Sequence, residues 1–181
     1  MIALLQRVTE AEVTVQGEAL ARIGHGVLAL IGIERDDTSL EADRLAHRLL
    51  TLRLFDDADG RMNLDIAQAQ GELLLVSQFT LAADTRKGRR PGFSTAAPPE
   101  RAQPLFEAFV RRVRVSHPEA GTGRFGAHMR IALVNDGPVT FRLRVAPAAV
   151  SAASEGASAT ASDATPTCTL AGSQTPPESG S

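Results

Sequence analysis

A short polar segment, Ser77-Gln78-Phe79-Thr80-Leu81, directly follows the apolar run Leu73–Val76. This run and Val27–Ile33 are continuously apolar, which predicts two strands that are buried on both faces. Polar side chains at the end of a buried strand are often placed where substrate groups are held. The residues alone favour a simpler interpretation, in which Ser77 and Thr80 only hydrogen-bond the backbone where the strand ends. The segment is therefore a candidate site, with both interpretations open.

The hydroxyl groups of Ser77 and Thr80 are of the kind that a covalent mechanism uses, provided that a base lies close enough to take the proton. Histidine is the usual base in such sites, and no histidine of this chain stands in a recognisable triad motif. The four histidines are His25, His47, His117 and His128. Each is more typical of a surface or core residue, so the sequence gives no direct support for a side-chain nucleophile.

A second polar segment, Asn135-Asp136-Gly137-Pro138-Val139-Thr140, separates two apolar stretches. Asn, Asp, Gly and Pro are turn residues, and an ordinary hairpin turn is the simple interpretation. Pro138 does not suit that interpretation, because proline removes a hydrogen-bond donor at the start of the following strand. The Gly137–Pro138 bond is also a candidate for the cis form, which is found in about 5–6% of bonds that precede proline.

Four cations lie within five residues in Arg86-Lys87-Gly88-Arg89-Arg90, a few positions after Leu81. An exposed basic loop of this kind is usually just solvated. Beside a binding site it could instead hold phosphate, through its charge and through the backbone freedom of Gly88. The residues favour neither interpretation over the other.

Two helices and six strands are predicted around these segments. The capping box Thr38–Glu41 begins the first helix, whose apolar positions continue at helical spacing to Leu52. The second helix begins at Pro98-Pro99-Glu100 and ends before Pro118. The expected strands are Ile2–Val8, Glu12–Gln16, Val27–Ile33, Leu73–Phe79, Met129–Val134 and Val139–Val145. This pattern predicts one α+β domain, a mixed β-sheet or small barrel flanked by two helices.

Length and composition limit the class of protein. The chain has 181 residues, 43% of them hydrophobic, which is enough for one domain with a real core. No apolar run approaches the ~18–20 residues of a membrane span, and the start of the chain lacks the basic region of a signal peptide. The single cysteine, Cys168, excludes an internal disulfide and a multi-cysteine metal site. We expect a cytoplasmic protein without a membrane partner.

Residue usage divides the chain into two parts. Of the 36 residues in 146–181, 29 are Ala, Ser, Thr, Pro or Gly, and none is basic or aromatic. Such a segment buries too little apolar surface to offset its chain entropy, which predicts a disordered tail after a domain of residues 1–145. The domain carries 19 basic and 18 acidic groups. Its bulk charge gives no case for nucleic-acid binding, so any such site must be local.

The two polar segments, Ser77–Leu81 and Asn135–Phe141, resemble the D-aminoacyl-tRNA deacylase family, and Gln6-Arg7-Val8 near the start agrees with it. Further similar stretches are Met62-Asn63-Leu64, Lys87-Gly88, Arg90-Pro91 and Gly123-Arg124-Phe125 with Met129. The resemblance spans the whole predicted domain. The chain departs from the family pattern at Gly92, where serine is frequent, and at His128, where an acid is usual.

The resemblance implies an enzyme that hydrolyses the ester between a D-amino acid and tRNA, with mischarged glycyl-tRNA as a related substrate. It implies a homodimer that binds tRNA and not DNA, and that uses no metal or organic cofactor. Phe79 and Thr80 would act at the reacting ester, and Gly137 and Pro138, joined by a cis bond, would reach into the partner's pocket. The other residues that it implies at or near the site are Ser77, Gln78, Arg7, Ala102, Phe125 and Met129.

The chemistry of the substrate agrees with the missing triad. An aminoacyl ester is already activated, so positioning and oxyanion stabilisation need to supply only a few kcal/mol. Backbone N–H groups at Phe79 and Thr80 could do this without a histidine, and the 2′-hydroxyl of the terminal adenosine is the natural group to activate water.

Two other classes of function stay open. A threonine-nucleophile acyl hydrolase of peptides or small esters would need the Thr80 hydroxyl and no tRNA. A tRNA-binding module without chemistry would need only the basic loop, and it would bind without turnover.

Overall fold

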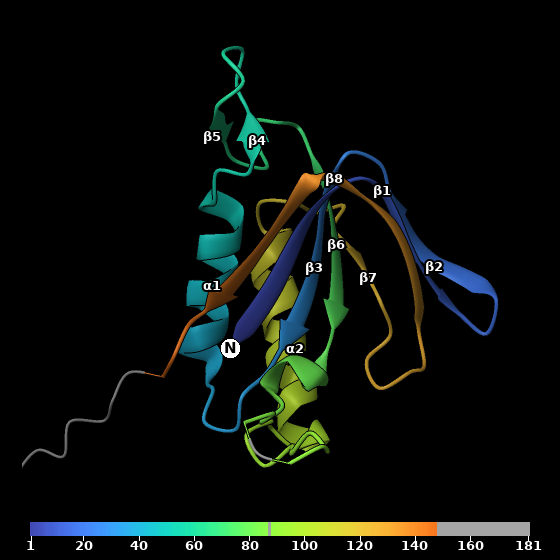
Figure 1. The fold of residues 1–181 in the computed structure, drawn as a ribbon, viewed down its shortest axis with the longest axis vertical. Coiled ribbons are helices and arrows are strands. Elements are labelled where there is room, and N and C mark those ends of the chain that lie inside the picture. Colours follow the sequence, from blue (N-terminus) through green and yellow to red (C-terminus); the bar gives the residue numbers. More distant parts are fainter. Residues whose placement is uncertain (87, 148–181) are drawn as a thin grey trace, which may run out of the picture. The chain divides into compact units, whose positions relative to one another are not determined.

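The computed structural model describes residues 1–86 and 88–147 (Figure 1). Its elements in chain order are β1 (Ile2–Val15), β2 (Glu18–Ile23), β3 (Gly26–Gly32), α1 (Ser39–Thr51), β4 (Phe55–Asp56), β5 (Met62–Leu64), β6 (Glu72–Ser77), the 3-10 helix η1 (Phe79–Ala82), α2 (Pro99–Arg114), β7 (Gly121–Thr122) and β8 (Arg130–Arg144). The α+β class with a mixed sheet and two helices is confirmed. From residue 148 on, the segment predicted as a disordered tail lies outside the described residues.

β1 is one long strand where the sequence suggested two, Ile2–Val8 and Glu12–Gln16, and that expectation was wrong. The exposed pair Thr9-Glu10 does not end the strand, because the ladder to β8 only shifts its register there. A bulge of this kind bends a strand and lets it continue. The first half of β1 pairs with β3 and its second half with β2, and both pairings are antiparallel. β2 itself was not predicted.

β8 also unites two expected strands, Met129–Val134 and Val139–Val145. Its ladder to β1 jumps from Asn135 to Thr140, so residues 136–139 form a bulge opposite Arg7. The hairpin-turn interpretation of this segment was therefore wrong. We call these four residues the 136–139 bulge.

Hydrogen bonds from Asn135 hold the 136–139 bulge together. Its Oδ1 accepts the Val139 N–H at 2.9 Å, and its Nδ2 donates to Thr140 Oγ1 at 3.1 Å. These bonds replace the ladder bonds that the bulge interrupts. The Gly137–Pro138 peptide bond inside the bulge is cis, the form for which the sequence made it a candidate.

The main sheet has the strand order β2-β1-β3-β6-β7, with β8 paired to β1 beside this path. β3 runs parallel to β6, and β6 runs parallel to β7, whereas β1 is antiparallel to its neighbours. α1 and α2 pack against each other and cover one face of the sheet (Figure 1). No helix among the described residues is long and apolar enough to cross a membrane.

Side chains that alternate along β6 divide the core into two clusters. Leu73 and Leu75 face the helices, while Leu74 and Val76 face the opposite side, toward β2 and β8. β3 and β6 are buried on both faces, as their apolar runs predicted. The second cluster is smaller, and Met129 of the β7–β8 connection is only partly buried at its edge. The candidate site lies at this edge.

α1 begins at the capping box that the sequence predicted. The Leu40 N–H donates to the Thr38 hydroxyl at 3.2 Å, and the Thr38 N–H donates to the Glu41 carboxylate at 2.9 Å. α2 begins at Pro99, where the missing N–H of proline costs nothing because that group has no partner inside the helix. Both helices thus start where local residue chemistry dictates.

Candidate active site

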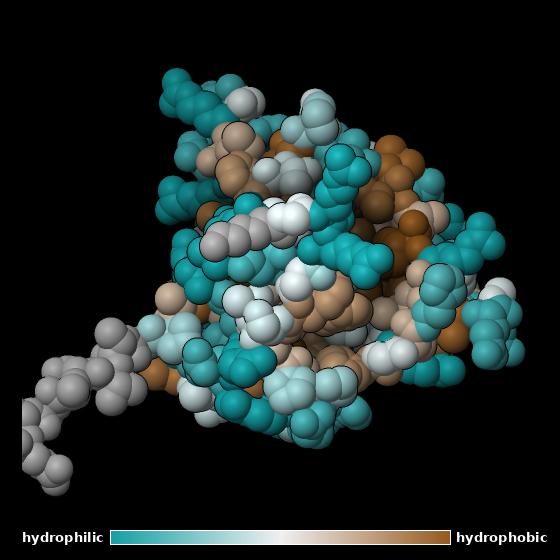
Figure 2. All heavy atoms as spheres, turned by 60° about the horizontal axis from the view of Figure 1, so that its bottom comes forward, coloured by the Kyte–Doolittle hydropathy of each residue, from teal (hydrophilic) through white to brown (hydrophobic). Residues whose placement is uncertain are grey.

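A cavity of about 860 Å³ lies where β6 ends. Six of the ten site residues expected from sequence line it: Ser77, Gln78, Phe79, Ala102, Phe125 and Met129. They come from the end of β6, from η1, from the first turn of α2 and from the connection between β7 and β8. Figure 2 shows a hollow with brown, apolar side chains on this side of the molecule. The fold therefore gathers residues that lie up to 52 positions apart, from Ser77 to Met129.

β6 ends two residues earlier than expected, at Ser77, and the prediction of a strand through Phe79 was wrong. The Gln78 N–H still donates to the Ile31 carbonyl at 2.7 Å, after which the chain turns into η1. The first two N–H groups of η1 belong to Phe79 and Thr80. Among the described residues neither of these groups donates a hydrogen bond, as is usual for the first turn of a helix. Two backbone donors are thus left free next to the cavity.

Thr80 is exposed and is not among the residues that line the cavity. Its hydroxyl accepts a hydrogen bond from Gln78 Nε2 at 2.6 Å. Within residues 1–86 and 88–147, no histidine or carboxylate hydrogen-bonds this hydroxyl. The side chain therefore lacks the base that a threonine nucleophile needs.

Aromatic rings form one wall of the cavity. Phe79 is 58% exposed and Phe93 is 42% exposed, and their ring centroids lie 5.1 Å apart. Large exposed apolar side chains grouped beside a hollow are typical of a ligand site. On the opposite wall, a Cβ at Gly123 would lie 2.6 Å from the Met129 sulfur, so only glycine allows Met129 this position.

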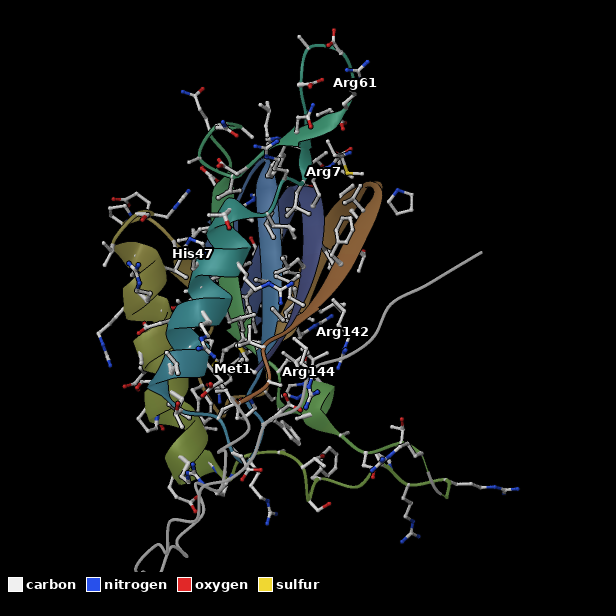
Figure 3. All side chains as sticks on the ribbon, turned by 90° about the vertical axis from the view of Figure 1, so that its left-hand side faces the viewer. Met1, Arg7, His47, Arg61, Arg142 and Arg144 are labelled. Carbon is white, nitrogen blue, oxygen red and sulfur yellow. The ribbon has the colours of Figure 1, made fainter. Side chains whose placement is uncertain are left out.

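Three further expected residues, Arg7, Gly137 and Pro138, do not line the cavity. The Arg7 side chain is buried, and its Nη1 donates to the Leu54 carbonyl at 3.0 Å and contacts Asp56 at 3.2 Å. Its Nε lies 3.0 Å from the carboxylate of Asp136 in the 136–139 bulge. Gly137 and Pro138 are exposed and do not line the cavity of their own chain. Figure 3 places Arg7 near the end of the sheet where β4 and β5 lie.

Several lining residues were not found by sequence reasoning. They are chiefly Arg35, Phe93, Ala96, Pro98, Arg101 and His128. Three of them, Phe93, Ala96 and Pro98, lie in the irregular segment between η1 and α2, where no periodic pattern predicts a role. His128 is the one histidine in the lining, and it had been interpreted as an ordinary surface or core residue. Across the described residues, no group of three His, Cys, Asp or Glu side chains is placed to hold a metal ion.

The family model described as D-Tyr-tRNA(Tyr) deacylase matches residues 4–144. A D-aminoacyl-tRNA deacylase of Azotobacter vinelandii is 62% identical over 143 residues, which are 79% of this chain and 99% of that protein. A D-aminoacyl-tRNA deacylase of Citrobacter koseri is 57% identical over 145 residues, which are 80% of this chain and 100% of that protein.

Two solved structures agree with the fold. One is titled c-Myc DNA Unwinding Element Binding Protein; it is 41% identical, with a TM-score of 0.78 over 82% of this chain and 100% of its own. The other is titled as a probable eukaryotic D-amino acid tRNA deacylase; at 18% identity and a TM-score of 0.68 over 78% of this chain and 98% of its own, it supports the fold alone. Because the family model and its relatives cover the whole globular part at high identity, this chain belongs to the D-aminoacyl-tRNA deacylases, enzymes that hydrolyse the aminoacyl-tRNA ester.

Proposed function

We propose that the cavity beside Phe79 binds the 3′-terminal aminoacyl-adenosine of tRNA and that its ester is hydrolysed there. The observation that carries this proposal is the pair of free N–H groups of Phe79 and Thr80 next to the apolar cavity. A negative charge develops on the ester oxygen when water attacks, and preorganised backbone donors stabilise such a charge. Addition of water then breaks the bond between the acyl carbon and the 3′ oxygen, which releases the amino acid and tRNA.

We assign activation of the water to the substrate's own 2′-hydroxyl. The Thr80 hydroxyl is engaged by Gln78 at 2.6 Å and has no base beside it among the described residues. His128 is an exposed residue of the cavity lining, a position that suits contact with the ligand no less than it suits catalysis. An aminoacyl ester is already activated, so correct positioning of the water and the ester supplies most of the remaining reduction of the barrier.

We further propose that two copies of the chain complete each site, with Gly137 and Pro138 of one copy at the cavity of the other. Gly137 and Pro138 are exposed and do not line the cavity of their own chain. Arg7 binds Asp136 and thereby holds in place the 136–139 bulge that carries them. β8 also exposes two large apolar side chains, Val134 at 50% and Phe141 at 39%. We assign them to the contact with the second copy, where they would be covered.

Selection of the D-enantiomer would then work by exclusion. The two enantiomers differ only by exchange of hydrogen and side chain at one carbon. A rigid wall placed where an L side chain would lie rejects every L-amino acid, whereas a pocket for D side chains would have to fit each of them. Such a wall cannot reject glycine, so we propose glycyl-tRNA as a second substrate.

The decisive experiment compares hydrolysis of matched D-tyrosyl-, L-tyrosyl- and glycyl-tRNA. The proposal expects rapid release from the D-ester, measurable release from the glycyl ester and none from the L-ester, even at high enzyme concentration. Equal hydrolysis of both enantiomers would refute selection by exclusion. Hydrolysis of small esters at the same rate as tRNA would instead favour an acyl hydrolase, and binding without turnover would favour a tRNA-binding module.

A further inference from the structure

The basic segment found in the sequence forms an arm beside the cavity. The N–H and carbonyl of Asp84 exchange hydrogen bonds with those of Gly92, at 2.7 and 2.8 Å. These two bonds close the segment 84–92, which we call the basic arm. At its base the Thr95 hydroxyl donates to the Ala82 carbonyl, and the Thr95 carbonyl accepts the Arg35 N–H at 2.9 Å. These bonds fix the root of the arm.

The sequence of the basic arm contains one carboxylate, that of Asp84, and an excess of basic residues. Arg86 binds Asp84 with two parallel bonds, at 2.9 and 2.8 Å, and the Arg86 side chain holds the pKa of that carboxyl well below its usual range. Both oxygens of the Asp84 carboxylate are therefore paired with Arg86. Arg89 and Arg90 are exposed and have no carboxylate partner among the described residues. Figure 3 shows nitrogen-tipped side chains that project from this segment.

The root of the basic arm is also the rim of the cavity. Phe93 follows Gly92 directly, lines the cavity and packs against Phe79, with the ring centroids 5.1 Å apart and the rings tilted by 51°. A ligand whose terminal nucleoside lies in the cavity can lead the rest of its chain past this rim, which brings it to the basic arm. For an RNA that chain carries one negative charge at every nucleotide.

We propose that Arg89 and Arg90 bind backbone phosphates of the tRNA 3′ end, and so position the aminoacyl-adenosine in the cavity. The inference rests on the proposed function, because it places the terminal nucleoside beside Phe79. Planar guanidinium groups match phosphate geometry and bind it through paired N–H donors. Contacts to phosphate fix register and carry no sequence information, so the arm would serve tRNAs of every amino-acid identity.

The test measures kcat/KM for D-tyrosyl-tRNA at 50 and 200 mM salt, for the wild type and for the double variant Arg89→Gln/Arg90→Gln. Each phosphate contact to a single strand contributes a slope of about 0.7 to the dependence of log affinity on log salt. Loss of two contacts should therefore reduce the slope by about 1.4. Between 50 and 200 mM salt, kcat/KM of the wild type should then fall by a factor about sevenfold larger than that of the variant. The matched control is Arg111→Gln/Arg112→Gln, which removes the same charge from the last turn of α2 and should keep the wild-type slope.

A second substrate separates phosphate binding from damage to the cavity. D-tyrosyl-adenosine has the ester and the nucleoside but no phosphate. The arm variant should therefore lose kcat/KM on the tRNA substrate and keep the wild-type kcat/KM on D-tyrosyl-adenosine. Equal slopes for wild type and arm variant, or an equal loss on D-tyrosyl-adenosine, would overturn the proposal. If the wild type hydrolyses neither substrate, the proposed function fails, and the arm is judged by the salt dependence of binding to deacylated tRNA. There an unchanged slope in the arm variant overturns the inference, and a reduced slope supports it.

Discussion

Arg7 of β1 and Asp136 of β8 form an ion pair across the sheet, with 3.0 Å between Arg7 Nε and the Asp136 carboxylate. The same Nε lies 3.3 Å from the Asp136 carbonyl, while Nη1 contacts Leu54 and Asp56 on the other side. One buried guanidinium thus joins β1, the 136–139 bulge and the segment before β5. Asp136 immediately precedes Gly137, so the position of the bulge depends on this contact.

Arg7→Lys should destabilise the bulge. Lysine keeps the charge, but its single ammonium group cannot reach partners on both sides at once. We expect the free energy of unfolding to fall by about 1–3 kcal/mol, as for loss of hydrogen bonds to a charged group. Urea denaturation measures the change. The control is Arg22→Lys, whose exposed pair with Glu10 at 3.2 Å should contribute less than about 1 kcal/mol. Equal effects of the two substitutions would contradict a special role for Arg7.

Thr80→Ala should keep most of the activity on D-tyrosyl-tRNA, because the substitution removes the hydroxyl and leaves the backbone N–H in place. A substrate that ends in 2′-deoxyadenosine should be hydrolysed poorly by the wild type, since it lacks the hydroxyl assigned to the water. Single-turnover rates at saturating enzyme isolate the chemical step in both cases. If Thr80→Ala abolishes turnover while binding survives, the threonine is the nucleophile.

Gly137→Ala should weaken discrimination between enantiomers. Gly137 has a φ of +128°, and a Cβ there would lie 2.5 Å from Val139 Cγ2 and 2.9 Å from the Val139 nitrogen. The bulge must therefore shift, and we expect the ratio of L- to D-ester hydrolysis to rise by about tenfold, which corresponds to about 1.4 kcal/mol.

Gly60→Ala is the matched control for this substitution. Gly60 also has a positive φ, of +74°, but a Cβ there would meet nothing within 4 Å. Gly60→Ala imposes backbone strain at a site remote from the cavity, so enantiomer discrimination should stay at the wild-type level. An unchanged ratio in Gly137→Ala, measured in a folded protein, would show that the bulge does not select the enantiomer.

His117 should make the protein less stable in weak acid. Burial lowers the pKa of its imidazole, against a smaller opposing effect of Asp65, and among the described residues its Nδ1 has no hydrogen-bond partner. The folded protein therefore disfavours the protonated ring, whereas the unfolded chain binds a proton near pH 6.5. Stability from this group is fully present above about pH 6.5 and is lost as the pH falls below it.

His117→Gln should flatten this pH dependence, because glutamine does not titrate. Thermal melts at intervals between pH 7.5 and 5 provide the measurement, and His47→Gln on the exposed face of α1 is the control. If the melting temperature of His117→Gln falls with acid as steeply as that of the wild type, another group is responsible.

Local chemistry explains which elements the sequence predicted well. The capping box at Thr38 places the start of α1, and the apolar run Leu73–Val76 identifies a strand that is buried on both faces, because both signals depend on neighbouring residues. The sequence predicted two strands in place of each long one because Thr9-Glu10 and the 136–139 bulge interrupt the apolar pattern. Only pairing with a distant strand shows that they are bulges.

The candidate site shows the same division. The segment from Ser77 to Thr80 was recognisable because polar residues interrupt an apolar run. Phe93 and Arg35 enter the cavity from coil, where position depends on tertiary contacts and not on periodicity. The residues around Gly137 did not by themselves show where it lies; only the resemblance implied a place in a partner's pocket. In the structure β8 runs along β1, and Gly137 does not line the cavity of its own chain.

The pairing of β1 with β8 has a consequence for synthesis on the ribosome. Ile2 is paired with Arg144, so β1, which leaves the ribosome before β8, finds a full-length partner only when β8 has emerged. Until then one edge of β1, fourteen residues long, offers unpaired N–H and C=O groups to any other extended chain. A nascent chain that stalls before residue 130 therefore exposes a template for aggregation, and chaperones that bind extended segments would protect it at that stage.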